Sequence, residues 1–115
     1  MGGRKTIELK LKKFKKNVNK DLSVSKMYFF GSRATGKPHK YSDIDLIIVS
    51  PKFRKLDFFK RGAKMYDYWN IDYPVDFLCY TPEEFNKLKK QITVVREAVR
   101  NGIKIWLPQN PPSQN

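Results

Sequence analysis

The apolar residues of this chain follow two spacings, one typical of helices and the other typical of strands. A first helix is predicted from Thr6, as its N-cap, to about Lys20. Its apolar residues recur every three or four positions: Ile7, Leu11, Phe14 and Val18. Because Ile7, Leu9 and Leu11 also alternate as in a strand, the first turn is open to both interpretations.

Short apolar runs predict the strands of a sheet. The run at 26–30 is nearly continuous, and the run at 44–49, closed by Ser50-Pro51, has the composition of a buried central strand. A third strand at 75–80 alternates, with Val75, Phe77 and Cys79 on one face and Asp76, Leu78 and Tyr80 on the other. A short terminal strand is predicted at 103–107.

Helical patterns fill the intervals between these runs. A helix across the sheet is predicted from the spacing of Leu56, Phe59, Ala63 and Tyr66, with Phe58, Tyr68 and Trp69 adding to its contact. Core packing is the expected use of this aromatic stripe, although it could also receive a base or a partner helix. Thr81-Pro82 followed by two glutamates predicts a capped helix start, and a further helix is expected through Ile92, Val95 and Val99 up to Arg100.

This order of elements predicts an α/β or α+β fold. We expect a mixed sheet of about four strands, with helices packed mainly on one side. With 115 residues, 40% of them hydrophobic, the chain can bury one modest core. We therefore expect a single domain over 1–107, and the Pro- and Asn-rich segment 108–115 is expected to be a disordered or extended tail.

The charge balance narrows the range of partners. Lys and Arg number 24 against 11 acids, and the net charge of +13 attracts nucleotides, nucleic acid or an acidic protein surface. The lysine-rich first helix could bind nucleic acid, but a solvated helix face is the commoner explanation of such a pattern. The single cysteine, Cys79, excludes an intramolecular disulfide. No apolar stretch approaches a membrane span and no signal peptide is recognisable, so a soluble cytoplasmic protein is expected.

The candidate chemistry lies between the first two predicted strands. Asp43 and Asp45 project from one face of the second strand, and two carboxylates placed so close are tolerated best with a cation between them. Carboxylate oxygens favour Mg²⁺. Upstream, Gly31-Ser32 with Arg33 and Lys37 forms a turn where backbone N–H groups and cations could meet a phosphate. The alternative for Ser32 is that it is only a helix N-cap. His39, the single histidine, is expected to be a solvated loop residue, with a contact to the nucleotide as the alternative.

The order Gly31-Ser32, ten residues, then Asp43-Ile44-Asp45 resembles the signature of the DNA polymerase β-like nucleotidyltransferase superfamily, in particular its minimal nucleotidyltransferase (MNT) family. The resemblance extends from about residue 22 to residue 106. Members often have Arg where this chain has Thr35. Arg33 and Lys37 are candidates for the phosphate or structural contact that this Arg makes in the family. The resemblance implies a palm-like core and a third carboxylate, for which Asp76 is the candidate and Asp72 the fallback; otherwise Asp76 lies on an exposed edge.

The resemblance also implies an activity and a partner. Two Mg²⁺ ions held by Asp43, Asp45 and Asp76 would support transfer of a nucleoside monophosphate, AMP from ATP in the expected case, to an acceptor hydroxyl with release of pyrophosphate. Members of this type are antitoxins paired with a HEPN-domain toxin. The alternatives are a non-catalytic basic module that masks a partner protein or nucleic acid, and transfer to a small molecule, which would require this short chain to form a homo-oligomer.

Overall fold

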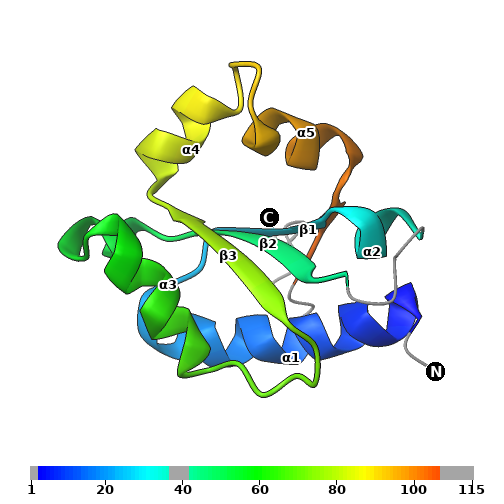
Figure 1. Ribbon diagram of the computed structural model, residues 1–115. Helices are drawn as coiled ribbons and strands as arrows, with labels where there is room; N and C mark the ends of the chain where they lie inside the picture. Colours follow the sequence, from blue (N-terminus) through cyan, green and yellow to red (C-terminus); the bar gives the residue numbers. More distant parts are fainter. Residues whose placement is uncertain (1–2, 37–41, 107–115) are drawn as a thin grey trace, which may run out of the picture.

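The computed structural model describes residues 3–36 and 42–106, which form a sheet enclosed by helices (Figure 1). The elements follow in the order α1 (Arg4–Leu22), β1 (Lys26–Phe30), α2 (Ser32–Thr35), β2 (Ile44–Val49), η1 (Pro51–Lys55), α3 (Phe58–Tyr66), β3 (Val75–Tyr80), α4 (Pro82–Leu88), α5 (Val94–Asn101) and β4 (Ile103–Lys104). Lys37, His39 and the predicted tail at 108–115 lie outside the described residues.

The sheet is mixed, as predicted, and has four strands in the order β3-β2-β1-β4. β1 is antiparallel to both β2 and β4, whereas β2 and β3 run parallel. β2 is central and almost wholly buried, in agreement with its continuous apolar sequence. β3 is therefore an edge strand, and Figure 1 looks onto the sheet from this edge.

Helices cover both faces of the sheet, so the prediction of helices mainly on one side was wrong. α1 and α3 lie below the sheet in Figure 1, and α4 and α5 lie above it. The reason is the composition of the strands: alternate residues of β2 enter two different cores, with Leu46 and Ile48 on the α1 side and Ile47 and Val49 on the α4/α5 side. A strand that is apolar on both sides needs cover on both sides.

α1 is the predicted helix, and its apolar stripe forms the lower core. It begins earlier than expected, with Gly3 rather than Thr6 as N-cap, because the N–H of Ile7 already reaches the Gly3 carbonyl at 3.1 Å. Lys15 is not a surface residue: it is 5% exposed, and its Nζ donates to the Ile105 carbonyl at 2.7 Å. This bond joins α1 to the end of the described chain.

The expected core face of α3 was wrong. Phe59 is 86% exposed and Tyr66 54% exposed, and Ala63 is exposed as well, whereas Arg61 and Met65 are buried. Arg61 can be buried because its guanidinium donates to the carbonyls of Phe53, Leu56 and Cys79 and forms an ion pair with Glu84 at 2.7 Å. Tyr68 and Trp69 do pack against the core. The 3₁₀ helix η1, capped by Ser50, was not predicted.

The last two helices agree with their predicted starts and ends within a few residues. α4 has the capping box expected at Thr81, in which the Thr81 and Glu84 side chains accept hydrogen bonds from each other's backbone N–H at 3.2 and 2.8 Å. α5 starts at Val94 behind the cap Thr93, so Ile92 lies before the helix and is 94% exposed. No helix in the described ranges is long and apolar enough to span a membrane.

Candidate functional site

Two of the candidate carboxylates come from neighbouring parallel strands. Asp45 of β2 and Asp76 of β3 are Cα partners, each at the second position of its strand. Asp43 lies immediately before β2, two residues from Asp45, where the period of an extended chain directs it to the same face. The structure thus brings Asp76 beside Asp45, the placement that the resemblance implied.

The carboxylates repel one another. Burial, followed by the negative charges of Asp76 and Asp43, raises the pKa of Asp45 above its ordinary value. Asp43 and Asp76 are exposed, whereas Asp45 is half-buried. In the described part of the chain none of these three side chains forms an ion pair with a Lys or Arg. The described residues therefore leave this negative charge uncompensated, and a cation would relieve it.

Gly31 holds the turn against Asp45. It follows β1 with φ 84° and ψ −170°, a combination that is almost restricted to glycine. A Cβ at this position would lie 3.1 Å from Asp45 Cγ and closer still to Oδ2. The register agrees, since Phe30 of β1 is the partner of Asp45 in β2. Gly31 is thus required both for the backbone angle and for the space that the carboxylate occupies.

The residues after Gly31 form the short helix α2. Gly31 is its N-cap and its carbonyl accepts from the N–H groups of Ala34 and Thr35, both at 3.1 Å. The alternative of Ser32 as the N-cap was therefore wrong. Thr35, at the position where the family often has Arg, donates its hydroxyl to the Ser32 carbonyl at 3.0 Å.

Arg33 is bound to the segment that carries the first aspartate. Its Nε donates to the Ser42 carbonyl at 2.7 Å, and its guanidinium lies 4.7 Å from the centre of the Tyr73 ring. Sequence reasoning did not identify Tyr73, and nothing in its spacing pointed to it. Arg33 therefore links α2 to the residue before Asp43 and to the approach to β3.

The donor set suits a hard divalent cation, since all three candidate ligands are carboxylates. Within residues 3–36 and 42–106, however, no three His, Cys, Asp or Glu side chains already converge as a metal-binding group. The strand register places Asp45 and Asp76 side by side, and the exposed side chains of Asp43 and Asp76 can change rotamer. The residues present therefore fit Mg²⁺ by type and by backbone position.

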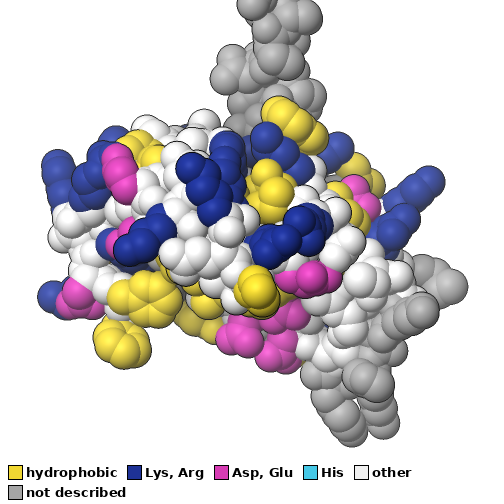
Figure 2. Space-filling view, turned by 90° about the horizontal axis from the view of Figure 1, so that it is seen from above, with side chains coloured by type: hydrophobic (Ala, Val, Ile, Leu, Met, Phe, Trp, Pro, Cys, Tyr) yellow, Lys and Arg dark blue, Asp and Glu magenta, His cyan; other side chains and the backbone are white. Residues whose placement is uncertain are grey.

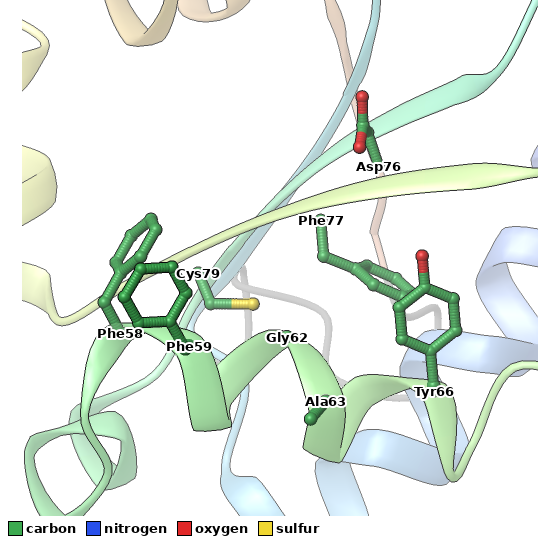
Figure 3. Close-up of a pocket in the computed structure, with 8 residues that line it drawn as sticks. All are labelled: Phe58, Phe59, Gly62, Ala63, Tyr66, Asp76, Phe77 and Cys79. Carbon is green, nitrogen blue, oxygen red and sulfur yellow. The ribbon is translucent and has the colours of Figure 1, made fainter.

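Two surfaces adjoin this site. Seen from the α4/α5 side, Lys and Arg side chains are spread over the face and acidic side chains gather near one rim (Figure 2). A groove between α3 and β3 includes Asp76 in its lining (Figure 3). Its α3 residues were expected in the core, and the only signal for the groove was the alternative that the aromatic stripe receives a ligand.

The fold has solved counterparts. A crystal structure from Sulfolobus solfataricus, of a protein assigned as a nucleotidyltransferase, matches over 95% of this chain and 94% of its own, with a TM-score of 0.54 and 20% identity. Two toxin–antitoxin crystal structures, one with AMP-PNP and one of a mutant MntA-HpeT complex, match over 90% of this chain and 75% of theirs, with TM-scores of 0.56 and 0.52 and identities of 23% and 22%. At these identities they show the shared fold.

A mixed sheet that carries paired aspartates beside a glycine turn defines the nucleotidyltransferase class. The model of the nucleotidyltransferase domain family matches residues 11–101, and the chain belongs to this family. A probable protein adenylyltransferase MntA from Haemophilus influenzae is 38% identical over 73 residues, which are 60% of this chain and 62% of that protein. These findings confirm the resemblance to the minimal nucleotidyltransferases.

Proposed function

We propose that this protein is a Mg²⁺-dependent nucleotidyltransferase that transfers AMP from ATP to an acceptor hydroxyl. In this reaction the acceptor oxygen bonds to the α-phosphorus, the bond from that phosphorus to the bridging oxygen breaks, and the hydroxyl proton and pyrophosphate leave. The observation that carries the proposal is the register of Asp45 opposite Asp76, with the Asp45 carboxylate packed on Gly31.

Asp43, Asp45 and Asp76 would hold the cations. Bound Mg²⁺ supplies charge neutralisation for the triphosphate and activation of the acceptor hydroxyl. The raised pKa of Asp45 reflects burial first and then repulsion from its two neighbours, so cation binding there removes an unfavourable interaction as well as adding a favourable one. Asp76, on the edge strand, is the carboxylate that would help hold the cation that activates the acceptor hydroxyl.

Gly31 and Ser32 are assigned to the β- and γ-phosphates. Gly31 allows the backbone conformation of this turn, and Ser32 adds an N–H and a hydroxyl at the start of α2. Arg33 supports this turn through Ser42 and adds positive charge beside it. Lys37, which lies outside the described residues, is the second cation of the proposal.

The proposed partner is a HEPN-domain toxin, with this chain as its antitoxin. The support is the similarity to MntA and to the proteins of two toxin–antitoxin structures. Because this chain spans 62% of the length of that MntA, its partner and acceptor are inferred by analogy. A protein acceptor also suits a small domain whose surface is strongly basic.

The test uses ATP labelled at the α-phosphate, Mg²⁺ and the co-purified partner. We expect label on the partner, no transfer in EDTA, and a loss of at least about a hundredfold in Asp45→Asn, because a carboxylate that holds the metal contributes several kcal/mol to the transition state. Asp67→Asn, at the exposed C-cap of α3, is the matched control and should transfer normally. Tight partner binding without any transfer would instead support the non-catalytic module.

A further inference from the structure

The outer edge of β3 carries unpaired backbone groups next to the candidate site. The carbonyls of Pro74 and Tyr80 accept from Ile44 and Ser50, at 2.9 and 3.0 Å, so the even-numbered positions of this strand direct their backbone groups toward β2. By the two-residue period of a strand, Val75, Phe77 and Cys79 direct theirs away from the sheet. β3 thus presents an open edge at its odd-numbered positions.

Phe77, in the middle of this edge, has both of its outward backbone groups open for pairing within the described residues. The Val75 carbonyl accepts from the Tyr66 hydroxyl at 2.9 Å, and the Cys79 carbonyl accepts from Arg61 Nη1 at 3.2 Å. Among the described residues, neither the N–H nor the carbonyl of Phe77 has a hydrogen-bond partner. One outward donor and one outward acceptor on the same residue are what an added extended chain requires.

A groove of about 260 Å³ runs beside this edge. One wall is β3, with Asp76, Phe77 and Cys79, and the other is α3. The α3 wall consists of Gly62 and Ala63 between the aromatic rings of Phe58, Phe59 and Tyr66 (Figure 3). Phe59 is 86% exposed, although helix residues this apolar are usually covered. The small residues leave room for an apolar side chain, and the rings would contact it on both sides.

We propose that this edge and groove bind an extended, acidic segment of the partner polypeptide, which adds to β3 as a further strand. The main chain of the segment bonds to Phe77, and one apolar side chain enters the groove. The acidic residues belong at the ends of the segment, because the net charge of the chain is +13 and Lys64 of α3 is exposed, whereas the centre of the segment is neutral because it lies beside Asp76. A nucleobase would leave the two backbone groups of Phe77 unused.

The same geometry identifies the acceptor, an inference that rests on the proposed function. In Figure 3 the Phe77 side chain points toward Tyr66, 5.0 Å away between ring centres, and the Asp76 side chain points away from α3. An added strand alternates in the same way, so a residue next to the apolar anchor projects on the Asp76 side. The acceptor hydroxyl is therefore placed directly adjacent, in the partner sequence, to an apolar residue.

Gly62 provides the test, because a side chain there fills the groove without disturbing the fold. A Cβ at Gly62 meets no atom within 4 Å, and replacement of a helix glycine by a better helix former stabilises the helix. The probe is the fluorescein-labelled octapeptide Glu-Glu-Val-Phe-Ser-Val-Glu-Glu, measured by fluorescence anisotropy without nucleotide or Mg²⁺. We expect Gly62→Gln to weaken binding at least tenfold and Gly62→Ala less than threefold, with neither variant less stable than wild type.

Further measurements locate the peptide and exclude other occupants. Binding should protect the Phe77 amide from hydrogen exchange, and N-methylation of the peptide next to its Phe should abolish binding. Ile92→Ser, at an exposed apolar residue before α5, is the control and should bind normally. No peptide binding, equal binding by Gly62→Gln, adenosine protecting the Phe77 amide, or a dimer of this chain that Gly62→Gln dissociates would each overturn the proposal. Asp45→Asn should bind the peptide without transferring AMP, so failure of catalysis and failure of docking are separate results.

Discussion

Replacement of Gly31 by alanine should destabilise the protein more than replacement of Gly36, although the two glycines have φ angles of 84° and 85°. At Gly36, ψ is 14° and a Cβ meets no atom within 4 Å, so alanine costs only the left-handed backbone strain, about 1–2 kcal/mol. At Gly31, ψ is −170° and the Cβ would collide with the Asp45 carboxylate. Strain of about 1–3 kcal/mol and overpacking of similar size add to about 2–6 kcal/mol.

Urea unfolding of the two variants measures this difference. Both should still fold, since a domain of this size is stable by about 5–15 kcal/mol. The collision is isolated by a double-mutant cycle with Asp45→Ala, whose side chain ends at the Cβ, 3.4 Å from the added methyl. We expect a coupling of about 1–3 kcal/mol between the two substitutions. Equal destabilisation by the two glycine variants, or additive effects in the cycle, would refute the packing of Asp45 on Gly31.

Other positions give independent predictions. In EDTA, Asp45→Asn should be more stable than wild type at pH 7. Because the pKa of Asp45 is raised in the folded state, the folded protein keeps this proton to higher pH than the unfolded chain, and wild-type stability falls as the pH rises from 3.8 through the raised pKa. The urea midpoints of wild type and Asp45→Asn should therefore coincide below pH 3.8 and separate above it. Arg61→Met should cost about 3–5 kcal/mol in urea unfolding, because it removes the ion pair with Glu84 and leaves three carbonyls without their donor. Arg54→Ala, which removes an exposed pair with Glu83, should leave the urea midpoint nearly unchanged. Burial raises the pKa of Cys79 to about 12, so native protein at pH 8 should not react with Ellman's reagent, and reaction should follow the unfolding curve.

The strands, and the pair Asp43 and Asp45 at the start of the second strand, could be predicted from local pattern. The strand at 75–80 alternates two residue classes, and the placement of Asp76 beside Asp45 follows once this strand neighbours 44–49. Periodicity alone does not show that these two strands are neighbours in the sheet; that expectation came from the family resemblance. The cover on both faces was also readable in principle, because β2 has no polar face.

The orientation of α3 could not be predicted, because two apolar patterns overlap in that segment. The sequence favoured a stripe with Phe59 and Tyr66 inside, while the fold buries Arg61 and Met65. An arginine can be buried only when several hydrogen-bond acceptors surround its guanidinium. Here these acceptors come from η1, β3 and α4. Such a set of partners is a property of the tertiary structure, which no local window contains.

The bond from Lys15 to the Ile105 carbonyl has a consequence for synthesis of the protein. Ninety residues separate donor and acceptor, so the ribosome makes the lysine long before the carbonyl that accepts its hydrogen bond. Until residue 105 leaves the exit tunnel, burial of Lys15 would leave its ammonium group without this acceptor, so hydration of the lysine is favoured over docking. Final docking of that helix must therefore wait until translation has passed the last strand.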